Sequence, residues 1–328
     1  NALQSSGGRW LIYSANPSGD TTGGLTPSFY QYNAPAGTGP SGSGNGLLYS
    51  LAPTLSVALT GEISKVYDGT TAATIAAANA PVTGLVNSDV AAVSGVYAQS
   101  DVGKNIVVTA NTITVTHNGA PVFGYGGTTP SVSASIGTIT PRSLTATVIG
   151  TPTKTYNRTT TASLTAANYQ ISGFVAGQGA TVDQASSVAY ASADAGVQTV
   201  NATFAPTSFI AGGGTNLANY ILPTSATGAG YINPASLLIT GVVANSKVYN
   251  GATNVATTLQ TGNAALYGII GADNVTLDSS GANGQFASGN VGSGLAVTGV
   301  GFTISGAQAN NYTLVQPTGL TANITLAS

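Results

Sequence analysis

One seven-residue pattern occurs three times in this chain of 328 residues and limits what the chain can fold into. The copies read KVYDGTT at residues 65–71, KTYNRTT at residues 154–160 and KVYNGAT at residues 247–253. Their tyrosines are 89 and 93 residues apart. This period is longer than the ~20–50 residues of a solenoid or propeller unit. The sequence therefore predicts a tandem array in which each copy belongs to its own small domain.

The spacing of the pattern divides the chain into four parts. We expect residues 1–53 to form an aromatic and glycine-rich N-terminal cap or connector, and residues 54–141, 142–234 and 235–328 to form repeats 1, 2 and 3. Each repeat ends on a similar strand and the next begins within a few residues, so no flexible linker separates them. Three domains of ~90 residues joined in this way would form a stiff rod on the order of 100 Å long. Because the sequence opens without methionine, we also expect it to be a piece of a longer protein.

Short alternating segments and low charge indicate the fold class. Charged residues make up 5% of the chain, against about 25% in an average soluble protein. Leu55, Val57 and Leu59 alternate with small polar residues, as do Ile113 and Val115, which is the pattern of strands with one buried face. The second strand ends at an Asn-Gly pair, residues 118–119, which favours a type I′ hairpin turn. The sequence predicts an all-β array of three small β-sandwich or β-grasp-like domains with a β-rich cap.

Two further landmarks recur with the pattern. An aromatic residue, an Asp or Asn and a glycine two positions later recur at residues 97–103, 190–196 and 286–292, which predicts a turn with the glycine in the left-handed region. An Asn-Tyr pair occurs at residues 219–220 and 311–312. Repeat 1 has Gly124-Tyr125 instead and is interpreted as the degenerate copy.

The repeated pattern itself is interpreted as a structural signature rather than a ligand site. Asp68 is replaced by asparagine in the other two copies, which preserves a hydrogen-bond acceptor but not an ionisable group. Each lysine is expected to lay its stem along the sheet with its ammonium at the surface. The residues that carry the signature are Lys65, Tyr67, Asp68 and Gly69, then Lys154, Tyr156 and Asn157, and then Lys247, Tyr249, Asn250 and Gly251.

The composition offers little material for catalysis or cofactor binding. The chain has one histidine, no cysteine and nine carboxylates, which are widely spread. His117 falls at a strand end, where we expect a solvated rim residue. Dense Asp/Glu calcium loops are absent from the sequence. A net charge of -2 gives no basic stripe for nucleic acid, and no apolar run is long enough to span a bilayer. We expect no enzymatic activity, cofactor or metal, and no nucleic-acid or membrane partner.

Aromatic residues are concentrated near the N-terminus. Trp10, Tyr13, Tyr30 and Tyr32 lie within the first 53 residues. They are expected to be buried against repeat 1. The alternative is a surface on which carbohydrate rings or a partner stack.

The three copies, the Asn-Tyr pair and the closing sequence at residues 139–141 together resemble the YDG/MBG-type repeats of large secreted bacterial adhesins of the filamentous haemagglutinin class. Residues 9–14 and 29–33 resemble the segment that precedes such repeats. Repeat 2 departs from the family pattern at Asn157 and Arg158, where the family has Asp and Gly. The resemblance implies two-partner secretion, an extracellular or cell-surface location, and a role in attachment, aggregation or biofilm matrix.

These observations predict a non-enzymatic extracellular stalk or fibre of a bacterial adhesin. Its partners are expected to be neighbouring repeats or copies of itself, and host or matrix glycans or proteins. Two alternatives remain open. One is a filament subunit that assembles head to tail by β-strand addition, and the other is a carbohydrate-binding module.

Overall fold

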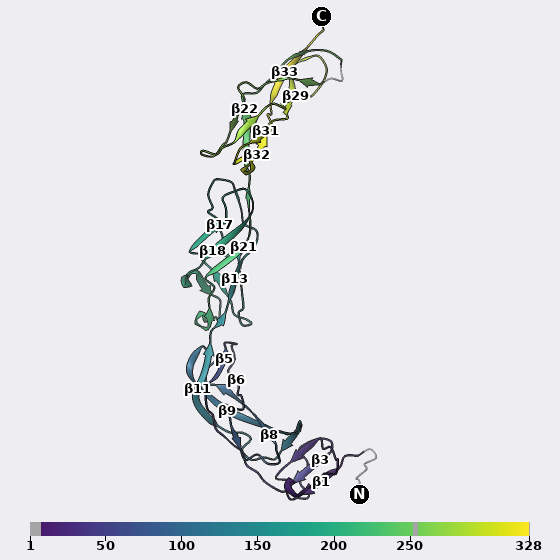
Figure 1. Cartoon of the computed structure of the whole chain (residues 1–328), viewed down its shortest axis with the longest axis vertical. Coiled ribbons are helices and arrows are strands. Elements are labelled where there is room, and N and C mark those ends of the chain that lie inside the picture. Colours follow the sequence, from purple (N-terminus) through teal and green to yellow (C-terminus); the bar gives the residue numbers. More distant parts are fainter. Residues whose placement is uncertain (1–7, 252–254, 328) are drawn as a thin grey trace. The chain divides into compact units, whose positions relative to one another are not determined.

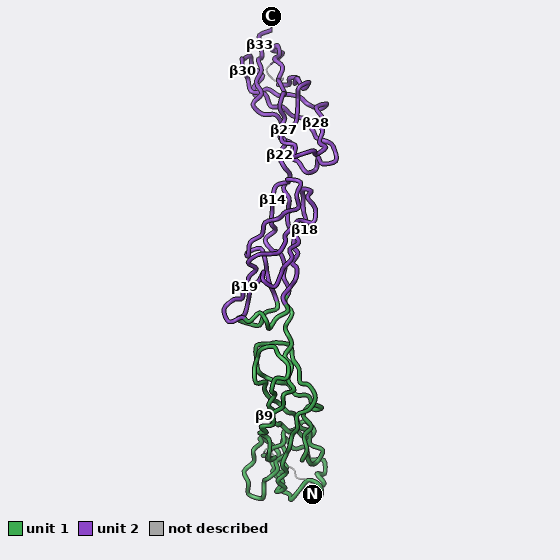
Figure 2. Tube along the Cα trace, turned by 90° about the vertical axis from the view of Figure 1, so that its left-hand side faces the viewer, with its two compact units in different colours: residues 1–144, 173–177, 216–221 green, residues 145–172, 178–215, 222–328 purple. Residues whose placement is uncertain are grey.

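The computed structural model describes residues 8–251 and 255–327. Ala252 and Thr253 of the third motif copy, and the terminal Asn1 and Ser328, lie outside the described residues. The chain forms two compact units, coloured separately in Figure 2. Unit 1 contains residues 1–144, 173–177 and 216–221, and unit 2 contains residues 145–172, 178–215 and 222–328. Unit 1 therefore holds the cap, repeat 1 and three short segments of repeat 2, residues 142–144, 173–177 and 216–221.

Unit 1 is built on one sheet of nine strands. Its central path runs β1-β3-β2-β10-β9-β11-β5, with β8 paired to β9 and β6 paired to β8. The strands are β1 (Leu11–Ser14), β2 (Phe29–Gln31), β3 (Gly46–Tyr49), β5 (Ile63–Val66), β6 (Ala72–Thr74), β8 (Val90–Tyr97), β9 (Gly103–His117), β10 (Ala120–Phe123) and β11 (Val132–Thr140). Two small pairs complete the unit, β4 (Ser56–Val57) with β7 (Val82–Thr83) and β12 (Arg142–Ser143) with β20 (Tyr220–Ile221).

Unit 2 contains the rest of repeat 2 and all of repeat 3. Its repeat 2 strands are β13 (Thr145–Val148), β14 (Thr153–Thr155), β15 (Tyr169–Ser172), β16 (Ala180–Val182), β17 (Ser187–Tyr190), β18 (Gly196–Thr203), β19 (Phe209–Ala211) and β21 (Ser225–Asn233). Its repeat 3 strands are β22 (Ala235–Thr240), β23 (Val243–Ala244), β24 (Lys247–Val248), β25 (Ala256–Thr257), β26 (Leu259–Gln260), β27 (Ala265–Tyr267), β28 (Thr276–Asp278), β29 (Asn283–Phe286), β30 (Gly292–Val300), β31 (Thr303–Ser305), β32 (Tyr312–Val315) and β33 (Leu320–Thr325).

The remaining regular elements are short 3-10 turns. They are η1 (Pro17–Gly19), η2 (Ala166–Asn168), η3 (Pro206–Ser208), η4 (Leu217–Asn219) and η5 (Ala309–Asn311). No α-helix occurs within the described ranges, so the prediction of an all-β chain is confirmed. Consistent with this, the described part of the chain has no helix that is long and apolar enough to cross a membrane.

The local strand predictions hold where the sequence alternates most regularly. On β9, Ile113 and Val115 are buried and the threonines between them are exposed. The chain then turns at Asn118 and Gly119, whose φ angles of 49° and 84° are the two left-handed conformations of a type I′ turn. Alternation therefore located both the buried face and the hairpin.

Each repeat joins its motif strand to its closing strand in the same register. The pairs β5–β11, β14–β21 and β24–β33 are all parallel, and β5 and β11 lie side by side in Figure 1. The motif lysines 65, 154 and 247 stand opposite the isoleucines 139, 232 and 324, which are almost completely buried. The recurring sequence thus marks, in each repeat, the strand that pairs in parallel with the closing strand.

The cap continues the sheet of repeat 1. Strand β2 pairs in parallel with β10, and Phe29 and Leu48 pack with Phe123 of β10 in a small apolar cluster. The cap is therefore joined to repeat 1 through both backbone and side chains.

Candidate functional site

The motif lysine holds its own loop together. Lys65 Nζ donates hydrogen bonds to Asp68 Oδ1 at 2.7 Å, to the Thr70 carbonyl at 2.7 Å and to the Ala72 carbonyl at 3.2 Å. The same ammonium lies 5.3 Å from the centre of the Tyr97 ring, and the side chain is only 15% exposed. The prediction that the ammonium lies at the surface is wrong for Lys65, because the turn that follows the strand directs oxygen acceptors at it.

The other two copies repeat this arrangement. Lys154 Nζ donates to the carbonyls of Thr159, at 2.6 Å, and Thr161, at 3.2 Å, and burial lowers the pKa of Lys154. Its ammonium lies 5.8 Å from the centre of the Tyr190 ring, and that of Lys247 lies 6.0 Å from the Phe286 ring. The aromatic residue of the second landmark is therefore the platform under each motif lysine.

Asp68 and Asn157 occupy the same acceptor position. Asp68 Oδ1 accepts from the Thr70 amide at 2.9 Å, and Asn157 Oδ1 accepts from the Thr159 amide at 3.2 Å. Burial raises the pKa of Asp68, but hydrogen bonds from Lys65 and Thr70 outweigh it and leave that pKa below its usual value. The turn needs an oxygen acceptor at this position, which Asp and Asn both supply.

Within unit 1, the Asn-Tyr pair of repeat 2 contacts repeat 1. The Tyr220 ring packs edge-on against the Tyr67 ring, with centroids 5.3 Å apart. Asn219 Nδ2 donates to Asp101 Oδ1 at 2.7 Å, and the Val102 amide donates to Asn219 Oδ1 at 2.9 Å. Asn219 is 1% exposed. Both polar ends of its side chain are therefore satisfied by a loop of the preceding repeat.

Within unit 2, repeats 2 and 3 are joined by the same contacts. The rings of Tyr156 and Tyr312 lie 5.4 Å apart, edge to face. Asn311 Oδ1 accepts from the Ala195 amide at 2.7 Å, and Asn311 Nδ2 donates to Asp194 Oδ1 at 3.1 Å. We call the motif tyrosine, together with the Asp- or Asn-containing loop at residues 97–103, 190–196 or 286–292, the acceptor face. The Asn-Tyr pair that contacts this face is called the donor.

The acceptor face corrects one turn prediction. Each of the three glycines begins a strand, Gly103 in β9, Gly196 in β18 and Gly292 in β30, but only Gly196 is left-handed, with a φ of 115°. The loop is shaped by the bonds that it makes to the next repeat as well as by its glycine.

The junction between repeats 2 and 3 also contains a buried carboxylate. Asp273 Oδ2 accepts from the hydroxyls of Tyr156, at 2.8 Å, and Tyr312, at 2.6 Å. Its other oxygen lies 3.1 Å from Arg158 Nε, and the Asp273 side chain is 3% exposed. Burial and then the hydrogen bond to Asp273 raise the pKa of Tyr156 to about 12. Arg158, which departs from the family pattern, thus provides the cation for a buried anion.

The cap contacts repeat 1 through a closely similar group. The Tyr32 and Tyr125 rings lie 4.8 Å apart, edge to face, and both hydroxyls donate to Asp89 Oδ2, at 3.1 and 2.7 Å. His117 Nδ1 lies 2.8 Å from Asp89 Oδ1. Burial, followed by the charge of Asp89, raises the pKa of Tyr32. The His117 side chain is only 14% exposed, so the prediction of a solvated rim residue is wrong: the carboxylate draws it inward.

A comparison with known families identifies the repeated unit. The YDG domain profile matches residues 52–121, 140–228 and 233–319, well over half of the chain. The chain belongs to the YDG domain family. No curated protein and no solved structure matches it.

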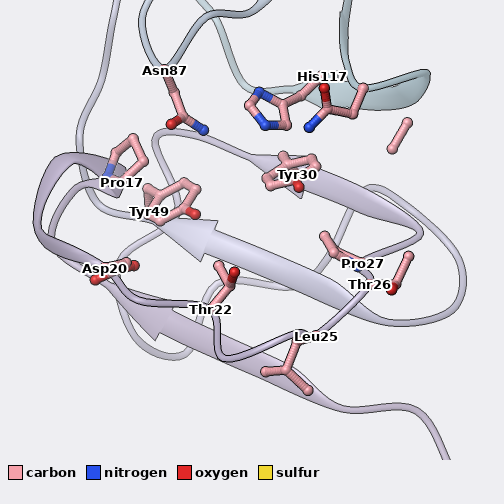
Figure 3. A pocket seen from close by; sticks show the side chains of 12 residues that line it. Pro17, Asp20, Thr22, Leu25, Thr26, Pro27, Tyr30, Tyr49, Asn87 and His117 are labelled. Atoms are coloured by element: carbon pink, nitrogen blue, oxygen red, sulfur yellow. The ribbon is translucent and has the colours of Figure 1, made fainter.

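A cavity of about 410 Å³ lies between the cap and repeat 1. Figure 3 shows Asp20, Tyr30, Tyr49, Asn87 and His117 around it. Tyr30 is 8% and Tyr49 1% exposed, so little of either residue is open to the cavity. Burial and then the charge of Asp20 raise the pKa of Tyr49 to about 12.

The four aromatic residues singled out in the cap have separate environments. Tyr30 and Tyr32 are buried, and Tyr13 is 36% exposed with its hydroxyl bonded to the Thr38 carbonyl at 2.7 Å. Trp10 is partly buried, and its amide donates to Asn45 Oδ1 at 3.1 Å. The cavity is lined by Tyr30 but not by Trp10, Tyr13 or Tyr32.

Sequence reasoning missed the residues that join the repeats. Asp89 stands five positions after Gly84, and Asp273 stands five positions after Gly268. These two glycines occupy equivalent positions in repeats 1 and 3. This equal spacing was the sequence signal that could have identified them as residues with a shared role. No group of three His, Cys, Asp or Glu side chains within residues 8–251 and 255–327 is placed to hold a metal ion.

Proposed function

We propose that this chain is a non-enzymatic structural stalk of an extracellular bacterial adhesin, which holds a binding region away from the cell or contributes to a biofilm matrix. Three YDG domains in tandem support this role. The observation that carries it is the parallel pairing of the motif strand with the closing strand in every repeat, in β5–β11, β14–β21 and β24–β33.

Parallel pairing of the motif and closing strands suits a chain that is pulled from its two ends. Tension reaches the motif strand from the N-terminal side of the repeat and leaves at the end of the closing strand. In a parallel pair these pulls run along the strands in opposite directions, so the hydrogen bonds between them are loaded together rather than one after another. Four residue pairs connect β5 and β11 in this way. A stalk that is loaded in shear needs strands that are paired in this way.

The side chains that could do chemistry are used in building the junctions. Asp89 holds two tyrosines and His117, and Asp273 holds two tyrosines and Arg158. A general base must be free to reach a substrate proton. These groups are instead buried and hydrogen-bonded, which supports a non-enzymatic role.

Single-molecule force measurements on the whole chain test the proposal. We expect three unfolding events, each releasing ~90 residues and therefore ~300 Å of contour length. Thr138→Pro, in β11, should lower the force of one event, because the register of the pair directs the Thr138 amide at β5 and proline cannot donate to the ladder. Thr74→Pro, in β6 of the same repeat, is the matched control and should change that force much less. Equal forces for both variants, or gradual extension without discrete events, would contradict the stalk role.

Filament assembly remains the alternative, although one contact opposes its simplest form. A second copy joining head to tail through the donor contacts would need Tyr125 of repeat 1, which is already covered by Tyr32 of the same chain. Assembly would then proceed by strand addition at another edge. A monodisperse species near 32.1 kDa in light scattering would exclude it.

The cavity of Figure 3 favours carbohydrate binding as a second candidate function. It combines the carboxylate of Asp20 with the amides of Asn87 and Asn118 beside Tyr30. Polar groups of this kind, set beside aromatic rings, suit sugar hydroxyls. Glycan-array binding that is lost in Asp20→Ala but retained in Trp10→Ala would place a sugar in the cavity. Loss in Trp10→Ala alone would place it on the outer surface of the cap.

A further inference from the structure

Repeat 3 carries the residues of an acceptor face and keeps two of the hydrogen bonds that shape the face of repeat 2. The Tyr249 amide donates to the Thr325 carbonyl at 2.8 Å, as Tyr156 does to Asn233 at 2.8 Å. The Asn290 amide donates to Ser288 Oγ at 3.2 Å, which matches the 3.1 Å bond from the Asp194 amide to Ser192 Oγ. The loop that receives a donor asparagine is thus already formed in repeat 3.

This third face is more open than the other two. Tyr67 and Tyr156 are 3% and 4% exposed beneath their partner tyrosines, whereas Tyr249 is only partly buried. Val291, which stands where Val102 and Ala195 stand, is 43% exposed. The face has the conformation of a junction while its tyrosine and its loop remain accessible.

We propose that the face formed by Tyr249, Asn290 and the Val291 amide binds the Asn-Tyr pair of a further YDG repeat that follows repeat 3 in the chain. The incoming tyrosine packs edge-on against Tyr249. The incoming asparagine accepts from the Val291 amide and donates to Asn290 Oδ1. Continuity with the two existing junctions supports this, because the equivalent backbone amide and the equivalent side-chain oxygen, there from Asp101 and Asp194, already perform these roles twice.

The motif residue after the Asx position further specifies which repeat fits. Gly69 leaves room for Val175 of repeat 2, whose Cγ1 would lie 3.0 Å from a Cβ at that position. Arg158 instead pairs with the buried Asp273 of repeat 3. Repeat 3 has Gly251 at this position and therefore lacks the cation that a buried aspartate requires.

The expected neighbour is therefore a YDG repeat of the repeat 2 kind. Repeat 2 has Gln178 where repeat 1 has Asp89 and repeat 3 has Asp273, each five positions after the shared glycine. A neutral amide at that position needs no counter-charge from the preceding repeat. A second copy of this chain is a poor occupant, because its repeat 1 carries Gly124 in place of the asparagine and is covered by its own cap.

The test extends the chain by one repeat. Residues 1–325 are followed directly by a copy of residues 141–234, because Thr325 ends its strand as Thr140 does. We expect hydrogen exchange at the Val291 amide to slow by at least ~10-fold relative to the 328-residue chain. Asn219→Ala in the added repeat should restore fast exchange. Gln178→Asp in the added repeat should remove most of the protection of the Val291 amide.

Three results would overturn the inference. One is unchanged exchange at Val291 while the β18 amides of the added repeat are protected, which shows that the added repeat is folded. Another is protection that survives Asn219→Ala. Protection that is unaffected by Gln178→Asp would remove the preference for the repeat 2 kind.

A second measurement needs no added repeat. In the 328-residue chain, Tyr249→Ala should lower the melting temperature less than Tyr156→Ala, because Tyr249 has more of its ring exposed. An equal or larger loss would show that the face is already satisfied within the chain and would contradict the inference. Neither experiment depends on the mechanical role, so the inference and the proposed function can fail independently.

Discussion

Replacing Asn311 by alanine tests whether the side-chain amide is what joins repeats 2 and 3. Asn311 is 4% exposed and makes two hydrogen bonds, to the Ala195 amide and to the Asp194 carboxylate. Each bond contributes about 1 kcal/mol net, and leaving a buried partner unsatisfied costs about 1–3 kcal/mol. We therefore expect Asn311→Ala to lower the free energy of unfolding by about 2–4 kcal/mol.

Calorimetry and hydrogen exchange measure this loss together. For a cooperative unit of this size the change corresponds to a fall in melting temperature of roughly 5–15 °C. Exchange at the Ala195 amide should accelerate more than exchange in the centre of β18, because the amide loses its acceptor directly. The matched control is Asn310→Ala, since Asn310 is the exposed neighbour on the same 3-10 turn. We expect its effect to stay within about 0.5 kcal/mol.

The reasoning is refuted if the two variants have equal stability. It is also refuted if Asn311→Ala destabilises the chain but leaves exchange at Ala195 unchanged, because the asparagine would then act only within its own repeat.

Three further predictions follow from the motif and the junctions. Lys65→Ala should cost about 2–3 kcal/mol in urea unfolding, because the loop oxygens lose a shared donor, whereas Lys104→Ala, at an exposed position, should change stability by less than about 0.5 kcal/mol. Arg158→Gly should destabilise the chain, and Asp273→Gln in the same chain should recover most of the loss, with a coupling of about 1 kcal/mol or more in a double-mutant cycle. The pKa of Tyr156 is raised to about 12, so the native state retains a proton that the unfolded chain releases near pH 10. The stabilisation is therefore full below pH 10 and is lost as the pH rises toward 12, with a slope of up to ~1.4 kcal/mol per pH unit. Tyr156→Phe should reduce this slope in an alkaline titration of stability.

Much of the fold could be predicted from spacing and alternation. The repeated lysine-tyrosine pattern located the strand that pairs with each closing strand, and alternation on β9 located its buried face. Periodicity carries this information because a strand with one buried face must place apolar residues at every second position. The Asn118-Gly119 turn was equally local, since both residues tolerate positive φ.

The junction could not be predicted, because its partners lie far apart in the sequence. Asn219 and Asp101 are separated by 118 residues, and Asn311 and Asp194 by 117. Sequence reasoning recognised each as a landmark of its own repeat and assigned Asp101 to a local turn. Nothing in a strand or turn pattern indicates that an exposed Asx loop of one domain receives an amide from the next. His117 was misplaced for the same reason, because its partner Asp89 lies 28 residues earlier in the sequence, just before β8.

The differences between the copies follow from their different neighbours. Repeats 2 and 3 each present an asparagine to the repeat before them, whereas repeat 1 has Gly124 there and meets the cap instead. Gly124 has a φ of 82°, and a Cβ at this position would overlap the backbone of Tyr32. The Tyr32 amide also donates to the Phe123 carbonyl at 2.8 Å, so the cap approaches through its main chain where a repeat would use a side chain.

Repeat 1 is therefore adapted rather than degenerate. It keeps Tyr125 and the buried Asp89, which meet Tyr32 of the cap as Tyr312 and Asp273 meet Tyr156. It gives up only the asparagine, for which the cap leaves no room. Terminal units of repeat proteins differ from internal ones because their outer faces meet something other than another repeat. By the same reasoning, repeat 3 supports the proposal of a further repeat rather than a second cap, because Tyr249 and Asn290 keep the tyrosine and the side-chain oxygen acceptor of the other two faces.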